Sequence, residues 1–189
     1  MSKKIGFIII ALLIAGVIGF WLFQSKSTHS SNVIQHRESL PVAFSSLLDE
    51  AMNGYFDIQK LLSKDQLSVA KNKSQQLSDQ LEVYIKQGQI FEKGSHWENE
   101  KNVLLTAYQN MADAKTIEDA RKHFEALSRS IENLVIHYGG PKDVSIFKYK
   151  CPMVDNNRGA SWLQNVTGTQ NPYYGSQMFN CGSKVKDLQ

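Results

Sequence analysis

Apolar side chains recur every three or four positions in four successive segments between residues 40 and 138, and this spacing limits what the chain can fold into more than any other feature. Such a period places the apolar residues on one face of an α-helix, so each segment predicts an amphipathic helix. The four predicted helices span about 40–62, 65–87, 95–111 and 116–138. Helices of this length joined by short connections pack best against their neighbours in sequence. The pattern therefore predicts an all-α fold, an up-and-down four-helix bundle over residues 39–140.

Local signals mark the ends of the last two helices. Ser95 and Glu98 fit a capping box, in which the serine hydroxyl accepts a hydrogen bond from the Glu98 amide and the carboxylate reaches back. Thr116 and Asp119 have the same spacing at the start of the fourth helix. The run Gly139-Gly140-Pro141 is expected to end that helix, because glycine accepts a left-handed cap and proline cannot continue a helix.

The N-terminus predicts a membrane anchor. Residues 5–23 are uncharged and apolar, and 19 residues at the helical rise span roughly 28 Å, about the thickness of the hydrocarbon core of a bilayer. Lys3 and Lys4 precede this run, so the positive-inside rule predicts a single-pass protein with a cytoplasmic N-terminus and an extracytoplasmic, periplasmic domain. A cleaved signal is the alternative for residues 1–23. The polar, Ser-rich residues 24–38 predict a flexible linker.

Charge and motifs exclude several classes of function. The chain has 21 basic and 18 acidic side chains and no Lys/Arg-rich tract, which argues against nucleic-acid binding. It also lacks a phosphate-binding glycine loop, a zinc-protease helix motif and a serine-hydrolase elbow. We therefore expect no enzymatic activity.

The helical period ends after residue 140, and residues 141–189 predict a small irregular C-terminal cap rich in Cys and Met. Val144, Ile146, Phe147 and Tyr149 form a short β-prone run. The remainder is expected to be loop, with one helical turn around 160–164.

Four sulfur side chains are paired within this cap: Cys151 with Met153, and Met178 with Cys181. Thiolate and thioether prefer Cu(I) and similar soft ions, so the four residues predict a soft-metal site. The chain has no other cysteine, however, and an extracytoplasmic domain with two cysteines also predicts one Cys151–Cys181 disulfide. The spacing alone leaves both explanations open.

Several blocks of the cap occur in an order that resembles a bacterial family of exported domains of unknown function, which also occurs fused to the C-terminal end of CusB-type periplasmic adaptors of heavy-metal efflux pumps. The blocks are Tyr149-Lys150-Cys151-Pro152-Met153, Gly159-Ala160-Ser161-Trp162-Leu163, Asn171-Pro172-Tyr173-Tyr174-Gly175 and Met178-Phe179-Asn180-Cys181-Gly182. The upstream helices are similar too, so the resemblance extends over about residues 40–185.

This resemblance implies copper or silver handling, with Cys151, Met153, Met178 and Cys181 at the matching positions as ligands. We therefore expect a membrane-anchored carrier or accessory in heavy-metal handling or efflux, with efflux-pump components as partners. The alternative is a structural or protein-interaction module that a Cys151–Cys181 disulfide stabilises. Two thiols close enough to share a metal are also close enough to oxidise, so the site is expected to respond to redox state.

Other side chains of the same regions have simpler explanations. Trp162, Tyr173 and Tyr174 are expected to pack over the open end of the bundle. His96 is expected to be solvated in a first helical turn, and His137 to lie where the helix dipole favours positive charge.

Overall fold

The computed structural model describes residues 37, 39–87 and 96–189. The chain divides into two compact units, residues 1–39 and residues 40–189, and the elements below belong to the second. The predicted anchor at 1–23, nearly all of the linker at 24–38 and Ser95 of the capping box lie outside the described residues. Within the described part of the chain, no helix has both the length and the apolar character needed to cross a bilayer.

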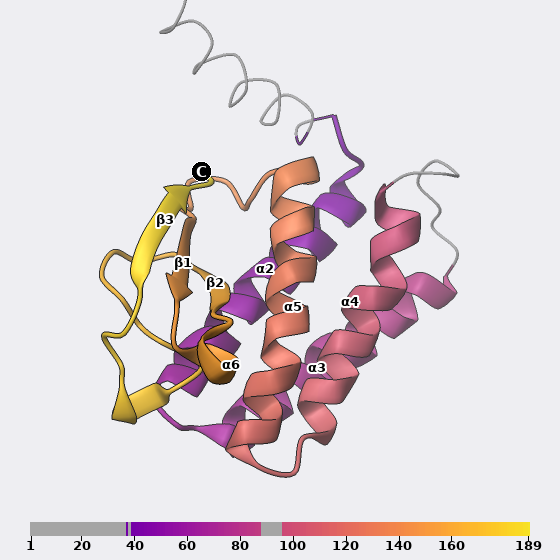
Figure 1. The fold of residues 1–189 in the computed structure, drawn as a ribbon. Helices are drawn as coiled ribbons and strands as arrows, with labels where there is room; N and C mark the ends of the chain where they lie inside the picture. The colour runs from indigo at the N-terminus through magenta and orange to yellow at the C-terminus, as the bar shows by residue number, and fades with distance from the viewer. Residues whose placement is uncertain (1–36, 38, 88–95) are drawn as a thin grey trace, which may run out of the picture. The chain divides into compact units, whose positions relative to one another are not determined.

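Four long helices form a bundle, as the apolar period predicts (Figure 1). They are α2 (Val42–Ser63), α3 (Leu67–Lys86), α4 (His96–Asp113) and α5 (Ile117–Tyr138). Each helix packs against the next in sequence, and α2 also contacts α5, which closes the ring of four. The side chains of the predicted apolar faces are buried inside this ring, including Leu48, Ile58, Leu104, Met111, Phe124, Leu127 and Ile131.

The ends of α5 follow the sequence signals. The Thr116 hydroxyl accepts a hydrogen bond from the Asp119 amide at 3.1 Å, while the Asp119 carboxylate accepts from the Lys115 amide at 3.0 Å. Gly139 has a φ of 76° and donates its amide hydrogen to the Val135 carbonyl at 2.9 Å. This left-handed residue ends the helix because glycine adopts such a φ without strain.

The end of α2 has no glycine, and Asp65 takes its place with a φ of 58°. The Asp65 amide donates to the Leu62 carbonyl at 3.2 Å and the Gln66 amide donates to the Leu61 carbonyl at 2.9 Å, the pair of bonds that defines a Schellman motif. Aspartate tolerates the left-handed region better than most side chains, so it can end α2 as Gly139 ends α5.

The C-terminal region is more regular than the sequence predicted, since it contains a three-stranded antiparallel sheet in the order β2-β1-β3. The strands are β1 (Phe147–Cys151), β2 (Ala160–Gln164) and β3 (Ser183–Asp187), and the short elements between them are α6 (Val154–Asn157) and η1 (Gly175–Gln177). The predicted helical turn at 160–164 is wrong: this segment is β2, and it pairs with β1 over its whole length, from Cys151 opposite Ala160 to Phe147 opposite Gln164. Hydrogen bonding to β1 determines that this segment is a strand, and local propensity carries no information about such a partner.

The sheet packs on the side of the bundle through β2, which contacts both α2 and α5 (Figure 1). Tyr55 of α2 is fully buried at this junction, where its hydroxyl accepts from the Leu163 amide of β2 at 2.8 Å and shares a 2.9 Å hydrogen bond with the Ser128 hydroxyl of α5. Burial raises the pKa of Tyr55 above its ordinary value, so the hydroxyl stays protonated. One side chain therefore links two helices to an edge strand whose backbone would otherwise be open.

Candidate functional site

The sulfur atoms of three of the four predicted ligands lie together. Cys151 Sγ is 2.8 Å from Cys181 Sγ, and Cys181 Sγ is 4.0 Å from Met153 Sδ. Both cysteines are free thiols, Cys151 fully buried and Cys181 partly buried, while Met153 is 45% exposed. The cluster therefore opens to solvent on the side of the methionine.

The fourth predicted ligand, Met178, is close in the backbone but does not join these sulfur contacts within the described residues. It lies just after η1, and its carbonyl accepts from the Cys181 amide at 2.9 Å in a tight turn. Its side chain is half-buried. The structure thus brings Cys151, Cys181 and Met153 together and leaves Met178 beside them.

The separation of the two thiols lies between those of two chemical states. A disulfide requires an S–S distance of about 2.05 Å. Two sulfurs that share one metal at about 2.3 Å stand roughly 3.8 Å apart in tetrahedral geometry. From 2.8 Å, either state lies within about 1 Å of side-chain movement, so the geometry suits both a disulfide and a shared soft ion.

Hydrogen bonding keeps Cys181 as a neutral thiol. The bond with the Cys151 thiol, with partial burial and the charge of a Cys151 thiolate as smaller causes, raises the pKa of Cys181 to about 11. A reactive nucleophilic cysteine has a lowered pKa instead. Metal binding and oxidation also proceed through the thiolate, so either reaction of this pair requires the loss of a thiol proton.

Asn171 fixes the position of the loop segment that carries Cys181, a role that the sequence did not predict. It is fully buried; its side-chain amide donates to the Cys181 carbonyl at 2.9 Å, and its backbone amide donates to the Phe179 carbonyl at 2.8 Å. Its side-chain oxygen accepts from the amides of Tyr173 and Tyr174 at 2.8 and 3.2 Å. Only the fold shows that the side chain of this asparagine bonds to the cysteine segment.

Met153 is held by a left-handed turn and by Tyr174. The segment that α6 covers contains Asp155, Asn156 and Asn157, all with positive φ, which polar residues of this kind tolerate. The Tyr174 hydroxyl donates to the Met153 carbonyl at 2.8 Å. This hydrogen bond links the segment of Met153 to the segment that leads to Cys181, in addition to the contacts between the sulfur atoms.

The other two aromatic residues are buried: Trp162 packs against the sheet, and Tyr173 packs against α5 on the side of the bundle. Trp162 is 1% exposed and lies against Tyr149 at 5.6 Å between ring centroids. Tyr173 is 7% exposed, its ring centroid is 5.8 Å from that of Phe124 on α5, and its hydroxyl donates to the Ser161 carbonyl.

Arg121 of α5 clamps the cysteine-bearing segment to the end of α2. Its guanidinium donates to the Pro172 carbonyl at 3.0 Å, to the Leu62 carbonyl at 3.3 Å and to the Asp65 carboxylate at 2.5 Å. The other Asp65 oxygen accepts from the Ser176 amide at 3.1 Å. Hydrogen bonds from Ser176 and then the Arg121 guanidinium lower the pKa of Asp65 below its ordinary value of 3.8. No motif in the sequence marks this clamp.

His96 and His137 are in direct contact, which the sequence did not predict. Their ring centroids are 3.2 Å apart and the rings lie 21° from parallel, so the two imidazoles stack across the α4–α5 interface. Burial, and then the charge of His96, lower the pKa of His137, and the Glu100 carboxylate acts in the opposite direction. The helix dipole favours a positive charge on His137, but burial and the neighbouring His96 oppose one.

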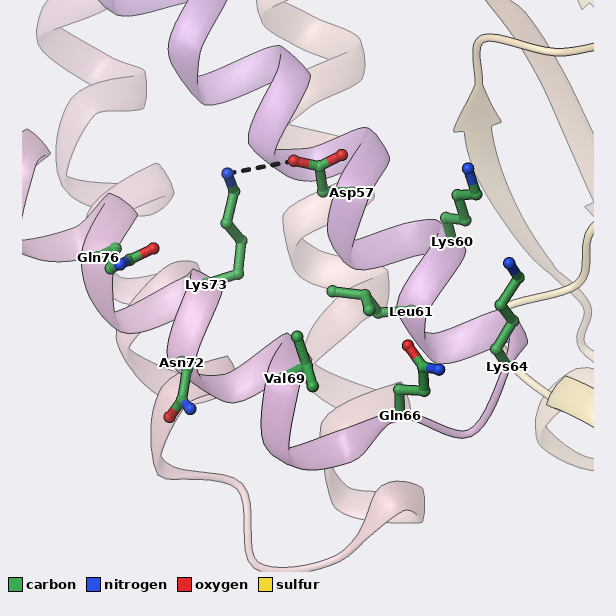
Figure 2. Close-up of a pocket in the computed structure, with 9 residues that line it drawn as sticks. All are labelled: Asp57, Lys60, Leu61, Lys64, Gln66, Val69, Asn72, Lys73 and Gln76. Carbon is green, nitrogen blue, oxygen red and sulfur yellow. Dashed lines mark ion pairs between the residues drawn. The ribbon is translucent and has the colours of Figure 1, made fainter.

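A separate open groove of about 430 Å³ lies between α2 and α3 (Figure 2). Leu61 and Val69 face each other across it, and Lys73 forms an ion pair with Asp57 at 3.1 Å. None of the four predicted sulfur ligands lines it. In the described part of the chain, no three His, Cys, Asp or Glu side chains gather as a metal site.

Comparisons with known proteins bear on the bundle and not on the sulfur cluster. No curated protein and no solved structure matches the chain significantly. A family model does match, but it ends before β1 and so includes neither cysteine; the resemblance of the C-terminal blocks to exported domains and to efflux adaptors stays a prediction. Over residues 51–143, which hold most of the helical bundle, the chain matches the family described as Protein of unknown function (DUF3347).

Proposed function

We propose that the protein binds a soft metal ion, Cu(I) foremost, through the thiolates of Cys151 and Cys181 with the Met153 thioether as a third donor. The observation that supports this most is the contact of Cys181 with both other sulfurs, at 2.8 Å to Cys151 and 4.0 Å to Met153. Two thiolates and a thioether form a donor set that suits Cu(I) or Ag(I), whereas Zn(II) rarely takes thioether. We include Met178 as a further donor, since a hydrogen bond from the Cys181 amide to its carbonyl joins the two residues in one turn.

A carrier or accessory role fits this cluster better than catalysis. The methionine side is exposed, which gives a metal ion a route in and out. With the anchor expected at residues 1–23, we propose a membrane-bound, extracytoplasmic protein that holds copper or silver for heavy-metal efflux components.

A Cu(I) competition experiment tests this proposal. The reduced full chain, titrated without oxygen against a chromogenic Cu(I) chelator, is expected to withdraw one Cu(I) per molecule. Met153→Leu is expected to weaken the competition more than Met178→Leu, and Cys151→Ser is expected to abolish it. Competition that is absent in the reduced protein, or unchanged by Met153→Leu and Met178→Leu together, removes the thioether site.

A second candidate function rests on the same 2.8 Å contact between the thiols: a structural or interaction module with a Cys151–Cys181 disulfide. Mass spectrometry of protein alkylated directly in cells distinguishes the two. A complete disulfide, with a melting temperature that falls on reduction and does not respond to Cu(I) or Ag(I), favours the module. Free thiols that become protected from alkylation when metal is added favour the carrier.

A further inference from the structure

The backbone that carries the two stacked histidines is held in place on both α4 and α5. Trp97, next to His96, donates its amide hydrogen to the hydroxyl of Tyr138, next to His137, at 2.8 Å. Both aromatic residues are buried, and Phe44 packs edge-on against each, at 5.1 and 5.4 Å between ring centroids. The positions of the two histidine Cα atoms are therefore set by core packing and not by the imidazoles themselves.

The side chains retain freedom on this fixed base. His96 is exposed and His137 is half-buried, so their rings can turn about the side-chain bonds without disturbing the core. A metal ion held by two imidazoles at about 2.0–2.1 Å needs their nitrogens roughly 3.3 Å apart. In the stack the ring centroids lie 3.2 Å apart and the in-plane lone pairs of the nearly parallel rings do not meet. The exposed His96 ring must therefore turn out of the stack, away from His137, until one nitrogen of each ring points at a common ion.

The charge around the pair favours a cation. Glu100 lies one helical turn after His96 on α4, and its carboxylate accepts from the Ser130 hydroxyl at 3.1 Å and the Asn133 amide at 2.9 Å of α5. It is thereby held at the same α4–α5 interface as His137, on which its negative charge acts. Imidazole is a ligand that Zn(II), Ni(II) and Cu(II) prefer over Mg(II) or Ca(II).

We propose that His96 and His137 form a second metal site, in which two imidazole nitrogens and solvent hold a borderline divalent cation such as Zn(II). This site shares no residue with the sulfur cluster and takes a different class of ion. It would allow one chain to hold a soft ion at the cysteines and a borderline ion at the other site.

Zn(II) is the probe for this site, added to the full chain in which Cys151→Ser and Cys181→Ser remove the thiolates that also bind zinc. Calorimetry is expected to show one bound Zn(II), and the ring ¹⁵N resonances of His96 and His137 are expected to shift together. His96→Ala and His137→Ala should each abolish the binding heat. Circular dichroism checks that both variants keep their helices, as alanine favours.

His123→Ala is the matched control, because His123 is also on α5 and faces Asp119 at 3.4 Å, away from the pair. This variant is expected to bind Zn(II) like its parent. The site is overturned if the double serine variant binds no Zn(II), or if His96→Ala and His137→Ala leave binding unchanged. Should the serine variant fold poorly, the ring resonances of the unmodified protein give the same decision. Neither result affects Cu(I) competition at the cysteines, so this inference and the proposed function fail separately.

Discussion

At the scale of single residues, Gly182 sets the geometry beside Cys181. It has a φ of 120°, a value that residues with a side chain avoid. A Cβ atom built on it lies 2.8 Å from Cη2 of the buried Trp162 and 3.0 Å from the Lys150 carbonyl oxygen. The cysteine segment can thus approach the sheet only because this position lacks a side chain.

Gly182→Ala is expected to destabilise the protein by more than the roughly 1–3 kcal/mol of backbone strain alone, since the Trp162 ring must also move. The displaced Cys181 should then form a disulfide with Cys151 more slowly. Urea unfolding and the rate of thiol loss under mild oxidation measure both effects. Gly168→Ala is the control: its φ is 82° but no atom lies within 4 Å of the added Cβ, so it carries the strain without the clash. Equal losses in the two variants would contradict this account.

At the scale of elements, the Asp65–Arg121 pair joins the end of α2, the start of α5 and η1. Gly175 makes this possible, because a Cβ on it would overlap the Asp65 carboxylate and the Arg121 guanidinium. Three segments distant in the sequence therefore meet at one ion pair, with the Arg121 side chain only 11% exposed. Because the Asp65 side chain is 38% exposed, solvent screens the ion pair itself, and its importance lies in the backbone groups of three segments that the two side chains bind.

The ion pair predicts a contribution to acid sensitivity. The folded-state pKa of Asp65 lies below its ordinary value of 3.8, so its stabilisation is complete above that pH and is lost as the pH falls through the folded-state pKa. Asp65→Asn keeps a side chain that tolerates positive φ but removes the charge. The difference in urea midpoint between neutral and strongly acidic pH is expected to be smaller in this variant than in the unmodified protein. Asp143→Asn, at another left-handed aspartate (φ 60°), should leave the difference unchanged.

At the scale of the whole molecule, the bundle and the sheet depend on each other. The family match ends at residue 143, before β1, yet β2 supplies the amide that Tyr55 binds and the segment after it supplies Tyr173, which covers Phe124. A bundle without the sheet exposes apolar side chains of α2 and α5 and leaves a buried hydroxyl without one of its partners.

Residues 40–189 alone are therefore expected to unfold cooperatively, while residues 40–143 are expected to bind a dye for exposed apolar surface and to melt at a lower temperature without a sharp transition. Calorimetry of the two fragments decides this. A sharp and equal transition in the shorter fragment would show that the sheet is an independent addition.

The sequence by itself determined the helices, because an apolar side chain every three or four residues has one economical way to be buried. It also grouped four sulfur side chains, those of Cys151, Met153, Met178 and Cys181, since their sulfur chemistry is a property of the residues. Tertiary structure decided what depends on distant partners. It made 160–164 a strand by pairing it with β1, left Met178 outside the sulfur contacts, and brought His96 against His137 across 41 positions of chain. Contacts of this kind arise from packing between elements, for which a local pattern of residues has no signal.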